Sequence, residues 1–240
     1  MNCEFSTITI KLVSLARSCS KVHIFALLAF AGALCFGALS GQAKSVNPGN
    51  SQLNTLLKKL DAVSCAASGF IDNLDGTVCD CTRNLMWEKK TGTVRDFADF
   101  VICTSTTDCP DPRDVNNTYS WSSSGQDPDG TVYTVFLAQL NDAAGSGAGC
   151  FAGHCDWRLP EAGDNAAVKE LETILDFTKG ICGGGIGACI NPIFGPTSED
   201  NYWSSTTLGS NAVLVTFGSG FVFDTTKDGF FLARAVRPCE

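Results

Sequence analysis

The sequence predicts a disulfide-rich α+β domain in which two main helices accompany a looped antiparallel sheet. Three observations lead to this prediction. Ten cysteines lie between Cys65 and Cys239, an even number that allows every one of them to pair. Short aromatic-rich runs alternate with connections rich in Gly and Ser, which is typical of strands joined by turns. Two segments, residues 134–144 and 165–178, carry apolar residues at helical spacing.

The N-terminal residues are arranged like an export signal. Three basic residues precede an apolar run over residues 22–39, and the small residues Gly41 and Ala43 follow it. The alternative is an uncleaved membrane anchor, because this run approaches the length of a spanning helix. We expect a signal peptide over residues 1–43, a leader with a short amphipathic helix over residues 44–64, and the domain over residues 65–240.

Charge and compartment limit the partners of the processed chain. Cleavage after Ala43 removes three basic residues and one acidic residue from totals of 17 and 25, which leaves a net charge of −10. An acidic surface repels phosphate backbones, so we expect no nucleic-acid partner. Disulfides persist in secreted, periplasmic and cell-surface proteins, and we expect this location. A membrane is expected to be contacted only through the signal segment, if that segment is not cleaved.

The remaining elements follow from local patterns. Leucines at helical spacing over residues 51–63 predict the leader helix. Residues 94–102 place Val94, Phe97, Ala98 and Val101 on one helical face. Residues 104–131, rich in Asp, Ser and Pro, predict an irregular loop. Strands are predicted over residues 70–75, 76–80, 83–89, 202–206, 212–217, 221–224 and 230–236.

The two main helices are each predicted to direct one apolar face to the core. In the first helix, this face consists of Phe136, Leu137, Leu140 and Ala144. In the second helix, it consists of Val168, Leu171, Ile174, Leu175 and Phe177.

Three segments of the chain resemble a known family. They are FIDNLDGTVCDCTRNLMWEK at residues 70–89, GHCDWRLPEAGDNAAVKEL at residues 153–171, and YWSST with the later ARAVR within residues 202–237. In order and spacing, they resemble the Lcl C-terminal domain family of bacterial exported proteins, which is named after the last domain of a collagen-like adhesin. The resemblance implies a distantly C-type-lectin-like fold. Asn84 stands where the family commonly has Gly, and no collagen-like Gly-x-y repeat is present, so the collagen-dependent behaviour of the adhesin is not expected here.

The motif residues of these segments are expected to be mainly structural. Trp157 and Leu159 are predicted to fill the core, and Arg158 to pair with a buried acid, because its planar guanidinium matches a carboxylate. The Asp-Gly pair of the first segment is typical of a hairpin turn. The motif residues are Asp75, Gly76, Trp87, Asp156, Trp157, Arg158, Leu159, Pro160, Tyr202, Trp203 and Arg237.

Close spacing predicts three local disulfides, Cys103–Cys109, Cys150–Cys155 and Cys182–Cys189. The lectin-like topology that the resemblance implies would allow Cys65 to pair with Cys239 and tie the ends of the domain. Cys79 and Cys81 would then remain, and a bridge across one residue is strained. Their connectivity therefore stays open.

Ligand-binding candidates come from one aromatic residue and from the acidic, Pro-broken loop within residues 104–131: Trp203, Asp108, Asp111, Asp127 and Asp129. Trp203 either packs in the core or stacks on a sugar. Carboxylates in loops are the oxygen ligands that Ca²⁺ prefers, so a calcium site is a candidate both here and around Asp72, Asn73, Asp75 and Asp80, although the spacing differs from the twelve-residue calcium loop.

No catalytic motif stands out in the sequence. His154 is the only histidine after the signal segment, and neither G-x-S-x-G nor H-E-x-x-H occurs. We therefore expect a non-enzymatic recognition or adhesion domain at the bacterial cell envelope, which binds a glycan or a surface protein. One alternative is a structural component of an envelope complex. Another is a hydrolase that uses acids such as Glu161, Asp164 or Glu199.

Overall fold

The computed structural model describes Thr55, Lys59, Cys65 and residues 69–143, 145, 147–178 and 187–239. The chain divides into two units, and the described residues all belong to the second, Asn54–Glu240. The predicted signal peptide lies outside the described residues, and so does the leader helix apart from Thr55 and Lys59. No helix within the described ranges is both long enough and apolar enough to cross a membrane.

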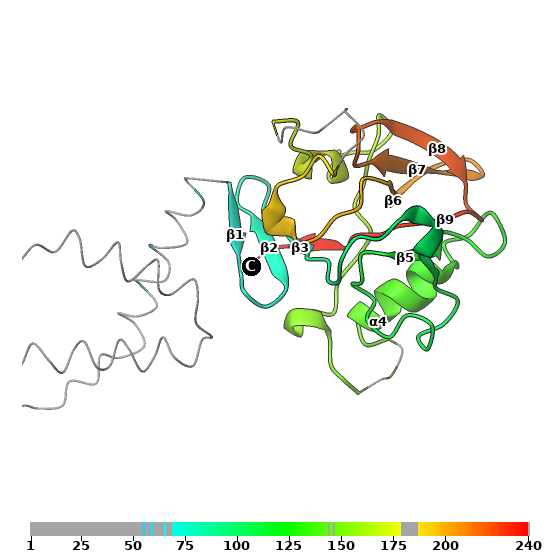
Figure 1. Ribbon diagram of the computed structural model, residues 1–240, viewed down its shortest axis with the longest axis horizontal. Coiled ribbons are helices and arrows are strands. Elements are labelled where there is room, and N and C mark those ends of the chain that lie inside the picture. The colour runs from blue at the N-terminus through cyan, green and yellow to red at the C-terminus, as the bar shows by residue number, and fades with distance from the viewer. Residues whose placement is uncertain are drawn as a thin grey trace, which may run out of the picture. The chain divides into compact units, whose positions relative to one another are not determined.

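The described residues form three small sheets (Figure 1). The first is antiparallel with the order β1-β2-β3-β10, where β1 is Phe70–Asp72, β2 is Thr77–Asp80, β3 is Leu85–Glu88 and β10 is Val236–Pro238. The second has the order β4-β5-β9, with β4 Val101–Ile102, β5 Asn117–Ser120 and β9 Phe230–Phe231. The third is antiparallel and consists of β6 Asn201–Leu208, β7 Asn211–Thr216 and β8 Val222–Thr226.

Helical structure is short. A π-helix, η2 (Val132–Leu137), runs directly into α4 (Ala138–Leu140). The other helical elements are single 3₁₀ turns: η1 Phe97–Asp99, η3 Phe151–Gly153, η4 Leu171–Ile174 and η5 Pro192–Phe194. The expected α+β fold with two main helices is therefore wrong, because the described residues are mostly β-sheet and loops with one short α-helix. The disulfide-rich character is confirmed by four described cysteine pairs.

The second main helix is missing because tertiary contacts compete with it. Only η4 is helical within residues 165–178. Leu175 adopts an extended conformation and pairs with Ile190 in an isolated antiparallel bridge. Next to it, the Asp176 N–H donates to the Cys189 carbonyl at 2.8 Å. Leu171 and Ile174 are buried as expected, whereas Val168 and Phe177 are 53% and 63% exposed, so the predicted apolar face does not exist.

Two hydrophobic clusters make up the core. One surrounds Trp203, Tyr119 and Phe136 and includes the buried side of η2 and α4. The other surrounds Trp87 and Phe194. The β6–β8 sheet contributes to both clusters, with Trp203 and Leu214 in the first and Tyr202 and Val215 in the second. Figure 1 shows β5 and β9 between the β6–β8 sheet and α4. Strand β5 lies within residues 104–131, where the sequence predicted only a loop.

The disulfides differ from the expected pattern at the domain ends. Cys103–Cys109 and Cys150–Cys155 are present as predicted. The expected Cys65–Cys239 pair is wrong: Cys65 pairs with Cys81, and Cys79 pairs with Cys239. The β2–β3–β10 pairing brings Cys239, which follows β10, within 6.1 Å (Cα–Cα) of Cys79 in β2, and Cys81, directly after β2, is left to pair with Cys65. Cys189 is disulfide-bonded, and Cys182 lies outside the described residues.

Candidate functional site

The DWRLP segment, residues 156–160, is held within the domain by an ion pair and by buried side chains. Arg158 donates from both Nη atoms to the two carboxylate oxygens of Glu170, each at 2.7 Å, which is the pairing predicted for this guanidinium. Burial raises the pKa of Glu170, but the bonds from Arg158 and the Glu161 N–H outweigh it and hold that pKa below its usual value. Trp157 and Leu159 are 3% and 2% exposed and fill the core as expected.

The same segment is bonded to the third family segment, within residues 202–237. Asp156 accepts from Arg237 Nε at 2.6 Å, and this bond lowers the pKa of Asp156. Arg158 and Val236 exchange backbone hydrogen bonds, and the Pro160 carbonyl accepts from the Ser205 N–H at 2.8 Å. Strand β10 of the third segment in turn pairs with β3 of the first, so the three segments are linked through the third.

The first family segment, residues 70–89, contains two turns in which a residue adopts a positive φ. Asp75 Oδ1 accepts from both the N–H and the Oγ1 of Thr77, and Gly76 follows with a φ of 95°. Asn84 has a φ of 57°, a left-handed conformation that Gly adopts freely and Asn tolerates. This conformation explains why the position that commonly holds Gly can hold Asn here.

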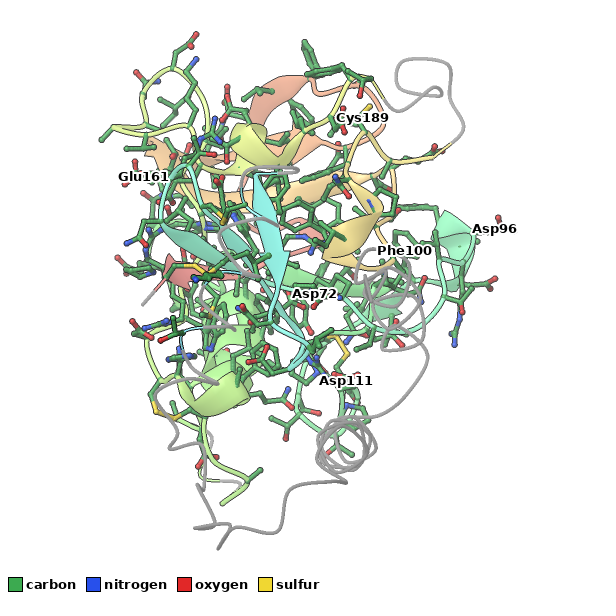
Figure 2. The ribbon with its side chains drawn as sticks, turned by 90° about the vertical axis from the view of Figure 1, so that its left-hand side faces the viewer. Asp72, Asp96, Phe100, Asp111, Glu161 and Cys189 are labelled. Atoms are coloured by element: carbon green, nitrogen blue, oxygen red, sulfur yellow. A yellow bond between two sulfur atoms is a disulfide. The ribbon has the colours of Figure 1, made fainter. Side chains whose placement is uncertain are left out.

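An open groove of about 690 Å³ lies elsewhere on the domain. Two segments line it: residues 94–97, 99 and 100, and residues 197–200 together with Gly187. We call this hollow the acidic groove, because four carboxylates line it, those of Asp96, Asp99, Glu199 and Asp200, against the single guanidinium of Arg95. Figure 2 shows Asp96 at the outer edge of the domain, on the turn that carries η1.

An aromatic ring projects at the acidic groove. Phe97 is 70% exposed and Val94 is 43% exposed. The rings of Phe97 and Phe100 lie 5.4 Å apart with an interplanar angle of 59°. The helical pattern predicted for residues 94–102 is wrong, because these residues form one 3₁₀ turn followed by β4.

Residues 197–200, which form one side of the groove, are held in place by hydrogen bonds to buried side chains. Thr197 Oγ1 accepts from Arg234 Nη2 at 2.9 Å, and the Ser198 N–H donates to Tyr202 Oη at 3.2 Å. Arg234 and Tyr202 are both fully buried. The Glu199 carboxylate accepts from the Gly187 N–H at 2.7 Å, which holds this carboxylate in place.

Comparison with known proteins supports the sequence resemblance. The family model described as the Lcl C-terminal domain matches residues 76–237. The chain belongs to this family. No curated protein and no solved structure matches it. The collagen-like adhesin context and the C-type-lectin-like relation therefore gain no support from the comparisons. Family membership and disulfides together indicate an extracellular or envelope domain.

The Lcl C-terminal domain does not present Trp203 to a ligand. This side chain is 0% exposed, and its Nε1 donates to the Tyr119 carbonyl at 2.7 Å. Its ring meets Phe231 edge to face at 5.0 Å. Stacking on a sugar is thus ruled out in this conformation, and the core interpretation holds.

The predicted acidic loop within residues 104–131 uses most of its candidate carboxylates in hydrogen bonds within the domain. Asp108 accepts from Thr104 and Ser105, and the Thr104 hydroxyl contributes most to lowering its pKa. Asp111 accepts from Thr91 Oγ1 at 2.7 Å. Asp129 accepts from the Ser123 Oγ and N–H and from Ser122 Oγ, and these bonds lower its pKa to about 2. Asp127 is exposed, with no side-chain hydrogen bond to another described residue.

The candidate calcium ligands near β1 and β2 also have protein partners. Asp72 pairs with Lys89 at 2.6 Å and Asp80 with Arg83 at 3.1 Å. Across the described part of the chain, no group of three or more His, Cys, Asp or Glu side chains could hold a metal ion.

The three candidate hydrolase acids lie in separate surroundings. Glu161 accepts from the Val168 N–H, and Asp164 pairs with Lys169. Only Glu199 lines the acidic groove. The groove as a whole was not predicted from the sequence. The available signal was the run Asp96-Phe97-Ala98-Asp99-Phe100, in which each aromatic follows a carboxylate and the apolar stretch is too short for a buried helix.

Proposed function

We propose that this Lcl C-terminal domain is a non-enzymatic recognition domain, exported to the bacterial cell envelope, which attaches to a glycan or a surface protein through the acidic groove. The observation that carries the proposal is the 70% exposed ring of Phe97 beside the exposed carboxylates of Asp96 and Asp99. Exposed aromatic rings next to polar groups are typical of recognition sites, because they supply contact area with little loss of conformational entropy.

The setting of the groove supports this role. Its Thr197–Ser198 side rests on buried Arg234 and Tyr202, so the binding groups are held on a rigid scaffold. Disulfides restrain the loops elsewhere, which suits a domain that acts outside the reducing cytosol.

The test compares binding by the wild-type domain with that of Phe97→Ala. Both would be applied to a glycan array and to an array of purified bacterial surface proteins. We expect the wild type to bind at least one ligand, and Phe97→Ala to bind it about tenfold more weakly, as for an aromatic hot spot. Phe221→Ala is the matched control, because Phe221 is 65% exposed but does not line the groove.

Two results would count against the proposal. One is the absence of binding to either array by correctly folded wild type. The other is an equal loss of binding in Phe97→Ala and Phe221→Ala. Stable association with an envelope protein that both variants retain would instead favour the structural role in an envelope complex.

A further inference from the structure

The acidic groove combines charge and aromatic surface in a way that selects among ligands. Asp96 and Asp99 are both exposed, and neither carboxylate has a side-chain hydrogen bond or ion pair within the described residues. Glu199 and Asp200 add two carboxylates from the other lining segment. Arg95 is the one basic residue among the described residues that line the groove, so these residues carry a net negative charge.

This charge favours a cationic ligand over the alternatives. A sulfated or otherwise anionic polymer would be repelled by both sides of the groove. A neutral sugar could donate hydrogen bonds to the carboxylates but would leave their charges uncompensated. A ligand with several positive charges would pair with carboxylates on both lining segments at once.

The exposed ring of Phe97 indicates which kind of cationic ligand fits the groove. The face of Phe97 is open to solvent and is next to Asp96 in the chain. A guanidinium or ammonium group over an aromatic face is attracted by the ring, and the aliphatic stem of Arg or Lys packs on apolar surface. The same kind of contact occurs inside this domain, where the Arg113 guanidinium lies 4.7 Å from the centroid of the Phe151 ring.

We infer that the acidic groove binds a basic, extended segment of a partner protein, with Arg or Lys side chains between the Asp96–Asp99 turn and the Glu199–Asp200 segment. The inference rests on the proposed function and specifies its ligand. The groove volume of about 690 Å³ is large enough for several side chains. Charge complementarity decides between a basic segment and other occupants.

The experiment measures binding of N-acetylated, C-amidated tetra-arginine and tetra-lysine peptides to the wild-type domain by calorimetry. A Gly-Ser peptide and a tetra-glutamate peptide of equal length serve as probes of neutral and negative charge. We expect only the basic peptides to bind, and their affinity to fall as NaCl increases, because salt screens exposed charges.

Matched variants place the binding in the groove. Asp96→Asn/Asp99→Asn should weaken the basic peptides about tenfold, since two exposed ion pairs are lost. Asp164→Asn/Asp228→Asn removes the same charge from exposed sites outside the groove and should change affinity less than about twofold. Phe97→Leu keeps apolar bulk but removes the ring face, so it should weaken tetra-arginine more than the control pair does.

The outcomes separate this inference from the proposed function. If basic peptides do not bind, or if both double variants weaken them equally, the inference is overturned. If an array glycan then binds the wild type and is lost in Phe97→Ala, the proposed recognition function stands with a different ligand. If basic peptides bind at the groove as expected, both conclusions are supported.

Discussion

At the scale of single residues, the domain buries charges that its signature motifs do not reveal. Lys90 Nζ lies 3.2 Å from the Glu88 carboxylate, and both side chains are almost fully buried. The ammonium group also sits 4.5 Å from the centroid of the Phe136 ring. Fully buried Arg234 adds a second positive charge and donates to the Glu88 carbonyl at 2.8 Å. One carboxylate thus balances two cations, and burial lowers the pKa of Lys90 to about 8 despite the attraction of Glu88.

This shift predicts that stability rises with pH above about 8. The unfolded chain holds the Lys90 proton up to its usual pKa of 10.5, whereas the folded chain releases it near 8, so the unfolded state binds more protons between these values. The free energy of unfolding should increase by on the order of 1–2 kcal/mol from pH 7.5 to 9.5. Urea denaturation at constant ionic strength would measure it.

Variants assign the effect to Lys90. Lys90→Met should abolish the rise in stability with pH. Because this change leaves the buried Glu88 carboxylate without its ion pair and can prevent folding, the double variant Glu88→Gln/Lys90→Met provides a second test. Lys169→Met, at an exposed ion pair, should keep the rise. The measurement stays below pH 10, because burial raises the pKa of Tyr119 and Tyr202 and ionisation of unfolded tyrosines would reduce stability there. A wild-type stability that falls across this range would contradict the assignment.

At the scale of elements, close contacts between backbone segments position loops that lie outside helices and strands. The turn before η2 lies against the end of β5: the Gly130 N–H donates to the Trp121 carbonyl at 3.1 Å. A Cβ at Gly130 would lie 2.4 Å from the Ser120 carbonyl oxygen, closer than any side chain can approach backbone. The second Asp-Gly pair of the sequence is therefore required by packing rather than by a hairpin turn.

Substitution of Gly130 should lower the free energy of unfolding more than substitution of a glycine that has no close neighbours. We expect Gly130→Ala to lower the free energy of unfolding by at least about 2–3 kcal/mol, because β5 and η2 must separate. Gly125→Ala is the control: its φ is 82°, but no atom lies within 4 Å of the added Cβ, so a loss of about 1 kcal/mol is expected. Equal losses in thermal or urea unfolding would show that the close approach has no energetic effect.

At the scale of the whole domain, the two ends of the described chain meet in one sheet. Strand β10 pairs with β3, Arg237 pairs with Asp156, and Cys79 is bonded to Cys239 across 160 residues of sequence. Figure 1 shows the C-terminus beside β2 and β3. This closure fixes the three family segments against one another and so holds the scaffold that supports the groove.

The long-range disulfide should therefore contribute most to stability among the described pairs. Removing it by Cys79→Ser/Cys239→Ser should cost roughly 4–5 kcal/mol, whereas Cys103→Ser/Cys109→Ser, which opens a loop of sequence separation 6, should cost about 2 kcal/mol. Urea denaturation of both variants tests the difference. Mass analysis of an unreduced digest checks the connectivity itself, and a Cys65–Cys239 peptide would contradict it.

Much of the β-structure could be predicted from local pattern. The strands that contain Trp87 and Trp203 lie where the alternation of apolar residues and the aromatic content predicted them. Arg158 also pairs with a buried acid, Glu170, as predicted for its guanidinium. The acidic groove could not be predicted in this way. The spacing of Phe97 and its neighbours predicts one face of a helix, whereas the structure places Phe97 in the 3₁₀ turn η1 with its side chain 70% exposed.

The sequence by itself determined the family, the abundance of disulfides and the positions of most strands, because these depend on residue type and short-range spacing. Only the tertiary structure decided that Leu175 joins a bridge instead of a helix, that Cys79 rather than Cys65 reaches Cys239, and that carboxylates from two distant segments line one groove. The physical reason is that apolar spacing indicates which residues can be buried, whereas the surface that each one meets depends on contacts between segments far apart in the chain.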